Sequence, residues 1–242
     1  MEPDVIWKAF ILCKELTLSG SYIYNGLKVF DEMETFYYEE EIFEFLYAIS
    51  VGIERLQKIA IILKENIVPT KQAEFEKSLI THNHLELMKR ITKTESKGIS
   101  SLSNKLLQLL SKFYKLWRYD RFSLSDYRNH DKEKAAFIDF IEKELNTHIV
   151  NEPLITTHND IRYKKFVGRT IGKITDYLYE IIKRESARLN VYTYEIRIHT
   201  KAYKIFIHKQ YDFINEDVFW KELLIYILNN SNNSRILELY KT

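Results

Sequence analysis

The chain has 242 residues and a formal net charge of +2, from 36 Lys and Arg residues against 34 Asp and Glu residues. Its hydrophobic share of 45% can bury a core, which excludes wholesale disorder, and its 6 Gly and 3 Pro are too few for the turns of a β-sandwich or barrel. The single cysteine, Cys13, excludes an intramolecular disulfide and a cysteine-based zinc site, which favours a reducing, cytoplasmic location. Its apolar helical context suggests a core residue rather than a nucleophile.

Helical periodicity runs through most of the chain and predicts a mainly α-helical bundle. The clearest segment is 40–65, where apolar side chains recur every three or four residues. Asn83, with Glu86 three residues later, predicts the capped start of a short helix. The other predicted helices cover residues 4–17, 22–33, 102–117, 125–145, 159–189 and 216–228, with Ser125 and Asn215 as expected N-caps. A break at residues 19–21 is expected between the first two of these.

One segment, 191–208, alternates apolar and polar residues in period two, which predicts a β-hairpin turning near Lys201. Residues 146–157 show little periodicity and are the candidate sub-domain junction. We therefore expect a helical bundle over residues 1–150. The long helix, the hairpin and a terminal helix, over residues 151–242, would pack on that bundle. The predicted fold class is mainly α with a small C-terminal β-hairpin.

Several chemistries lack their motifs. The sequence has no glycine-rich phosphate loop and no serine-nucleophile elbow, and we expect neither a cofactor nor a metal. His82 and His84 flank Asn83 at a helix start, and without a carboxylate at a telling spacing we expect them to be structural. Gly168 and Gly172, one helical turn apart, predict a close helix–helix contact. No targeting segment and no apolar run of ~20 residues is evident, so we expect no membrane contact.

The most polar junction of the chain lies between residues 118 and 134 and reads RYDRFSLSDYRNHDKEK. Free backbone N–H groups at the start of the predicted helix favour an anion there. Arginine offers phosphate a planar pair of donors, and histidine moves protons near neutral pH, so together they suit metal-free cleavage of an RNA phosphodiester. The candidate catalytic residues are Arg121, Asp126, Arg128 and His130, with Asp126 orienting one of the others. The alternative is an ordinary helix N-terminus with Arg–Asp pairs on its surface.

A basic stripe follows one face of the predicted helix 159–189. Spacings of three and four residues align its cations, and tyrosines lie near its edges, which suits a nucleic-acid backbone. The stripe consists of Arg162, Lys165, Arg169 and Lys173, with Tyr163 and Tyr177 at the edges, and Arg118 joins it as a candidate RNA-binding residue. A solvated helix face, or contact with the acidic residues 39–41 of a partner subunit, are the alternatives.

Charge is divided unevenly along the chain. Residues 1–70 hold 6 Lys and Arg against 12 Asp and Glu, a net of −6, which leaves 30 against 22, a net of +8, for residues 71–242. The two parts could attract each other across a dimer, or the basic part could meet a polyanion. Solvated helix faces are the simpler interpretation.

Two segments carry a resemblance to a known family. The run FEFLYAISVGIERLQKIAIIL (Phe43–Leu63), with its Gly-Ile-Glu-Arg-Leu turn, and the run THNHLELMKRI (Thr81–Ile91) resemble the second and third elements of HEPN proteins. These are small helical domains widespread in bacterial defence and toxin–antitoxin loci. The resemblance covers roughly Tyr37 to Lys143.

The resemblance implies a bundle of four or five helices that usually dimerises, and active members are metal-independent endoribonucleases. Their motif is an arginine, commonly followed by Asn, Asp or His, with a histidine after four to six further residues. Arg128-Asn129 matches the first half, whereas Glu133, Lys134 and Ala135 occupy the positions of the motif histidine. We therefore hold two hypotheses: a defence or toxin-type HEPN-like homodimer that cleaves RNA, or a catalytically degenerate HEPN scaffold that binds a partner protein of its operon or nucleic acid.

Overall fold

The computed structural model describes residues 3–120, 122, 124, 131–214, 220 and 224–226. The chain divides into a compact unit, Met1–Tyr211, and a smaller one, Asp212–Thr242. The elements of the first unit are α1 (Pro3–Ile6), η1 (Trp7–Ile11), α2 (Leu12–Glu32), α3 (Glu39–Glu65), η2 (Pro69–Lys71), α4 (Gln72–Ser78), α5 (His84–Thr92), α6 (Ser101–Lys112), η3 (Phe113–Trp117), α7 (Arg118–Asp120), α8 (Lys132–Leu145), β1 (Asn151–Glu152), β2 (Ile155–Thr156), α9 (Ile161–Arg188) and α10 (Lys201–Phe206). In the second unit, the described residues 214, 220 and 224–226 are helical.

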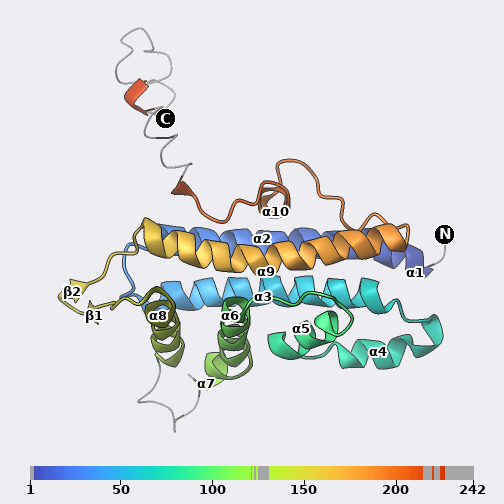
Figure 1. Ribbon diagram of the computed structural model, residues 1–242, viewed down its shortest axis with the longest axis horizontal. Helices are drawn as coiled ribbons and strands as arrows, with labels where there is room; N and C mark the ends of the chain where they lie inside the picture. Colours follow the sequence, from blue (N-terminus) through green and yellow to red (C-terminus); the bar gives the residue numbers. More distant parts are fainter. Residues whose placement is uncertain are drawn as a thin grey trace. The chain divides into compact units, whose positions relative to one another are not determined.

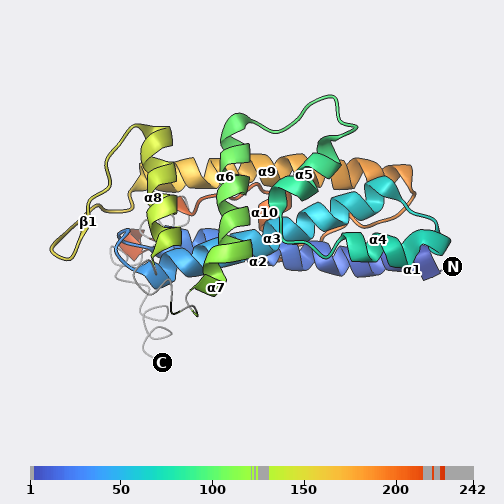
Figure 2. The ribbon, with the colours of Figure 1, turned by 90° about the horizontal axis from the view of Figure 1, so that it is seen from below.

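Three long helices, α2, α3 and α9, form the centre of the first unit and run along a common direction (Figure 1). The shorter helices α6 and α8 cross α3 on its far side from α2, as the turned view also shows (Figure 2). Helices α4 and α5 lie on that same side of α3, and α10 covers the opposite side of the unit by packing on α2. Helix α3 is consequently enclosed by neighbours over most of its length, and seventeen of its 27 residues are buried.

Small residues let α2 and α3 approach closely. The hydroxyl of Ser19 donates a hydrogen bond of 2.7 Å to the carbonyl oxygen of Gly52. A Cβ atom added at Gly52 would lie 2.6 Å from Cγ1 of Ile23, so a larger residue at this crossing would force the Ile23 side chain to move. The predicted break at 19–21 is therefore wrong. Ser19 and Gly20 lie buried inside a continuous α2, because both are needed for close packing.

An aromatic cluster closes one end of the core. The Phe30 ring centroid lies 5.0 Å from that of Phe45 and 5.7 Å from that of Phe137, and Phe36 meets Tyr163 edge-on at 5.3 Å. These residues come from α2, α3, α8, α9 and the loop after α2, so the rings join the long helices to the crossing ones. This packing uses part of the aromatic residues, which make up 14% of the chain.

The mainly helical class is confirmed, and the best periodic segments are helices. The predicted 40–65 and 159–189 correspond to α3 and α9, and Asn83 caps α5 by accepting hydrogen bonds from the amides of Leu85 and Glu86. For the helix predicted over 125–145, the structure describes its part from Lys132 onward as α8, and Ser125 is outside the described residues. None of the helices in the described ranges is both long and apolar enough to cross a membrane.

A small antiparallel sheet is present, but at another place than predicted. Strands β1 and β2 pair Asn151 with Thr156 and Glu152 with Ile155, within the segment 146–157. The prediction of a hairpin over 191–208 is wrong, because its second half forms helix α10.

Tertiary packing explains that difference. The Thr200 hydroxyl accepts a hydrogen bond of 3.1 Å from the amide of Tyr203 and caps α10. Ala202, Ile205 and Phe206 then face inward at helical spacing, and Ala202 fits against Gly20 of α2. The strand preference of so short an alternating segment is weak, and the helix cap and the contact with α2 outweigh it.

Candidate functional site

The predicted catalytic cluster cannot be placed. Arg121, Asp126, Arg128 and His130 all lie outside the described residues, so their role stays a prediction. Arg118, the nearest candidate, is described. Its guanidinium lies 3.9 Å from the centroid of the Tyr114 ring and 4.4 Å from that of the Tyr119 ring.

The predicted basic stripe lies on α9, and its members differ in availability. Arg162 donates a hydrogen bond of 2.7 Å to the carbonyl oxygen of Leu145 and so caps the end of α8. Arg169 and Lys173 are exposed, and within the described ranges the structure gives neither an ion pair. Lys165 is half-buried beside them. Of the three exposed cations in the stripe, Arg169 and Lys173 are therefore the two that a ligand could contact without displacing a described hydrogen bond.

The two tyrosines beside the stripe serve the fold. Tyr163 is buried against Phe36, and the Tyr177 hydroxyl donates a hydrogen bond of 2.8 Å to the carbonyl oxygen of Lys97. The buried Tyr163 ring is therefore not presented for stacking on a base. The Gly168 and Gly172 prediction also changes, because the close neighbour of both glycines is Tyr211 in the segment after α10 rather than another helix.

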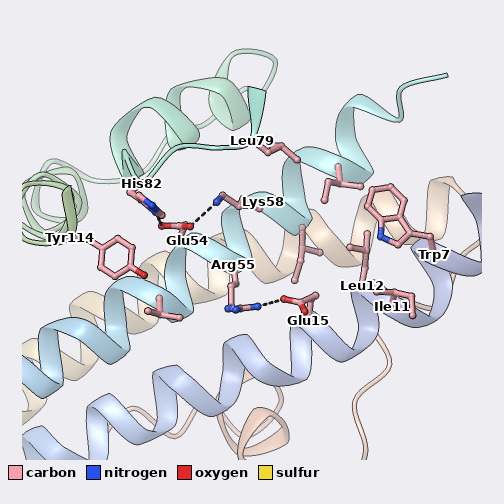
Figure 3. A pocket seen from close by; sticks show the side chains of 13 residues that line it. Trp7, Ile11, Leu12, Glu15, Glu54, Arg55, Lys58, Leu79, His82 and Tyr114 are labelled. Carbon is pink, nitrogen blue, oxygen red and sulfur yellow. Dashed lines mark hydrogen bonds and ion pairs between the residues drawn. The ribbon is translucent and has the colours of Figure 1, made fainter. Parts of the chain in front are cut away.

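A pocket of about 530 Å³ opens between η1, α2, α3, the segment before α5 and η3 (Figure 3). Its lining brings together charged groups from helices and loops far apart in the sequence. The residues are Trp7, Ile11, Leu12, Glu15, Val51, Glu54, Arg55, Lys58, Ile59, Ile62, Leu79, His82 and Tyr114. The helical stripe of α9 contributes none of them.

Glu54 is the buried charged group at the centre of the polar side. One carboxylate oxygen accepts a hydrogen bond of 2.7 Å from Lys58, and the other lies 2.9 Å from Nδ1 of His82 (Figure 3). Burial raises the pKa of Glu54, but the hydrogen bonds from Lys58 and His82 outweigh burial and leave that pKa below its usual range. Glu54 is therefore a carboxylate at neutral pH.

This charge state fixes the tautomer of His82. A carboxylate only accepts hydrogen bonds, so Nδ1 of His82 must carry the proton and Nε2 is left with a lone pair in the neutral ring. The side chain of His82 is 46% exposed, and its ring meets that of Tyr114 edge-on, with centroids 5.0 Å apart. The arrangement is a histidine oriented by a carboxylate, which can act as a general base.

The remaining polar groups stand close by. Arg55 forms an ion pair with Glu15 of α2. This ion pair uses one of the five N–H donors of the Arg55 guanidinium. Burial, followed by the negative charge of Glu54, raises the pKa of Tyr114, so its hydroxyl keeps its proton. The site thus combines an oriented base, two cations and a proton donor.

His84 differs from His82 although it lies only two residues away. It is fully buried, its Nδ1 lies 3.1 Å from Oε1 of Gln57, and Gln57 in turn donates a hydrogen bond to the His84 carbonyl oxygen. Burial lowers the pKa of His84 to about 4, which keeps the ring neutral. The prediction of a structural role fits His84, but His82 contacts the carboxylate that the sequence spacing did not reveal.

Both π-helical turns of the described region contribute to this pocket. Turn η1 supplies Trp7 and Ile11, and η3 supplies Tyr114. Such turns are uncommon and frequently accompany functional sites, because the extra residue re-aims the side chains around it.

In the ranges that the structure describes, no group of three or more His, Cys, Asp or Glu side chains could hold a metal ion. Cys13 is half-buried, its thiol donates a hydrogen bond to the carbonyl oxygen of Glu195, and burial raises its pKa, which disfavours the nucleophilic thiolate.

Comparison of the chain with family models, curated proteins and solved structures finds no match. Function is therefore inferred from the site itself.

Proposed function

We propose that the protein acts on RNA as a metal-independent endoribonuclease, with the Glu54–His82 pair as its acid–base group. The proposal is carried by one observation, the hydrogen bond that orients His82 on a buried carboxylate at the edge of an open pocket. The HEPN resemblance supports the same reaction class. Its two segments supply this pair, since Glu54 lies in the Gly-Ile-Glu-Arg-Leu turn and His82 in the second run.

The reaction needs no group beyond the side chains of the pocket. Nε2 of His82 takes the proton of a ribose 2′-hydroxyl, whose oxygen attacks phosphorus and forms a 2′,3′-cyclic phosphate. The bond to the 5′ oxygen breaks, and in this proposal the Tyr114 hydroxyl returns a proton to that oxygen. Arg55 and Lys58 stabilise the negative charge on the phosphoryl oxygens.

The first test is cleavage of total bacterial RNA in EDTA by the wild type and by His82→Ala. General base catalysis contributes about 10²- to 10⁴-fold, so His82→Ala is expected to lose activity by that factor. His148→Ala is the matched control, because His148 also pairs with a glutamate, Glu142, at 2.8 Å, yet its side chain is 82% exposed and lies outside the pocket. The control should cleave like the wild type.

A second arm separates this site from the cluster predicted in the sequence. If Arg128→Ala/His130→Ala abolishes cleavage while His82→Ala leaves it unchanged, the reaction belongs to that cluster and not to Glu54–His82. If the wild type leaves all RNA intact, the alternative of a non-catalytic HEPN-like scaffold is favoured. The homodimer and the operon partner that this alternative requires stay predictions, to be checked by light scattering and co-purification.

A further inference from the structure

The pocket has two chemically different ends. His82, Glu54 and Lys58 lie at one end, and Trp7 lies at the other, with Arg55 between them (Figure 3). Around the indole the lining is aliphatic and comes from η1, α2 and α3. A ligand that fills the whole pocket therefore meets charged groups at one end and apolar surface at the other, and an anionic group can accept from the Arg55 donors that Glu15 does not use.

The turn η1, which carries Trp7, is fixed by hydrogen bonds of the next residue, Lys8, to other segments. Lys8, which follows Trp7, is buried, and its ammonium group donates a hydrogen bond of 2.8 Å to Asp4 and another to Asn66 at the end of α3. The Thr193 hydroxyl donates a hydrogen bond of 2.6 Å to the carbonyl oxygen of Lys8. Because η1 is fixed to two other segments, the pocket presents Trp7 without first having to order it.

We infer that the pocket takes one unpaired nucleotide of the RNA, with its base against Trp7 and its phosphate at Arg55 and Lys58. The volume of about 530 Å³ is that of a site for a small organic ligand and exceeds the needs of a phosphate alone. A nucleobase stacks on an aromatic side chain whatever its sequence, and a base can do so only when it has left a duplex. The inference rests on the proposed function, because it takes RNA as the source of the nucleotide, and it predicts single-stranded substrates.

The test uses a nucleotide that cannot react. 2′-Deoxyadenosine 3′-monophosphate lacks the attacking hydroxyl, so its binding is measured by calorimetry without cleavage, beside inorganic phosphate as the second probe. We expect the nucleotide to bind at least about tenfold more tightly than phosphate, since stacking on an aromatic residue adds roughly that factor or more. Trp7→Leu should reduce nucleotide affinity to the level of phosphate, and Trp7→Phe should keep most of it.

Trp117→Leu is the matched control, because Trp117 belongs to the other π-helical turn but does not line the pocket. The inference is overturned if the nucleotide binds no better than phosphate, or if folded Trp7→Leu, verified by circular dichroism, binds it as tightly as the wild type. RNA cleavage with Trp7-independent nucleotide binding would refute this inference alone. Trp7-dependent binding without any RNA cleavage would refute the proposed function alone.

Discussion

Glu54 and His84 are two ionisable side chains in the same region that the fold stabilises in opposite ways. Glu54 keeps its charge because Lys58 and His82 donate to both of its oxygens, which offsets the cost of removing a carboxylate from water. His84 loses its charge because burial offers it only a neutral amide, that of Gln57. The buried carboxylate orients an exposed histidine that can exchange protons with a ligand. The buried neutral histidine has no such role, and its protonation at acid pH destabilises the folded protein.

His84 should make the stability of the protein depend on pH. Its folded pKa of about 4 lies below the unfolded value of 6.5, so the unfolded chain binds a proton first as the pH falls through 6.5. Stability from this group is complete above pH 6.5 and is lost toward pH 4. Between pH 7 and pH 5 the free energy of unfolding should fall by about 2 kcal/mol.

Urea unfolding at pH 7, 6 and 5 measures this effect, with His84→Asn for comparison. The asparagine amide can still donate to Gln57 but cannot take up a proton, so the variant should lack this part of the pH dependence, whatever its stability at pH 7. Glu54 does not interfere, because its lowered folded pKa places its own loss of stability below pH 4.5. Equal pH slopes for wild type and variant would contradict the role given to His84.

The residue types of the candidate site can be read from the sequence, but the contact between them cannot be predicted from it. Glu54 lies next to the stripe residue Ile53 in α3, and its burial is seen in the structure rather than signalled by the sequence pattern. His82 lies 28 residues further on in a segment without periodicity, so no spacing rule connects the two. Their contact depends on the tertiary packing of the segment before α5 against α3, which local sequence patterns do not encode.

At the scale of elements, periodicity predicts the long helices well and the short ones poorly. The apolar stripes of α3 and α9 extend over seven turns or more. Burying that much apolar surface stabilises the helix more than any local contact stabilises another conformation. Helix α10 has only six residues, and its helical state depends on the cap at Thr200 and on Gly20 of another helix. Sequence patterns carry no information on that partner.

The glycines of α9 give a prediction at this scale. A Cβ atom at Gly168 would lie 2.0 Å from the carbonyl oxygen of Tyr211, a backbone atom that cannot rotate away. A Cβ at Gly172 would meet the ring of the same tyrosine at 2.5 Å, and this side chain can shift by giving up its hydrogen bond to Asp176. We expect Gly168→Ala to destabilise the protein by about 2–3 kcal/mol, more than Gly172→Ala.

Thermal and urea unfolding of both variants would measure the difference. Gly98→Ala is the control, because a Cβ there meets nothing within 4 Å and should change stability by less than about 0.5 kcal/mol. In an unobstructed helix, Gly→Ala stabilises by up to about 1 kcal/mol. A stabilised Gly168→Ala would therefore show that the Tyr211 segment does not pack on α9.

At the scale of the whole chain, the acidic and basic parts already meet within one molecule. Helix α9 packs on α2 and α3, and Lys164 lies 3.9 Å from Asp31. Arg90 of α5 pairs with Glu65 at the end of α3, with one hydrogen bond of 2.7 Å. Ion pairs between the two parts thus form within one chain, and a dimer is not required to explain the charge division.

Arg169 and Lys173, the exposed cations of the α9 stripe, give a prediction for RNA binding. Each phosphate contact to a single strand adds about −0.7 to the slope of log affinity against log salt concentration. Arg169→Ala/Lys173→Ala should therefore weaken binding of a single-stranded RNA and reduce that slope in magnitude by about 1.4, from two lost contacts. Fluorescence anisotropy of labelled poly(U) between about 50 and 200 mM salt measures both quantities.

Lys105→Ala/Lys143→Ala is the matched control, because these exposed lysines pair with Glu144 and Asp139 and belong to α6 and α8. Removing two lysines lowers the net charge as much as the stripe variant does, so a nonspecific charge effect would move both slopes equally. A loss confined to the stripe variant would identify the Arg169–Lys173 face as the RNA contact. Identical slopes for all three proteins would exclude that face, and the phosphate contacts would then have to be sought elsewhere, beginning with Arg118 beside Tyr114.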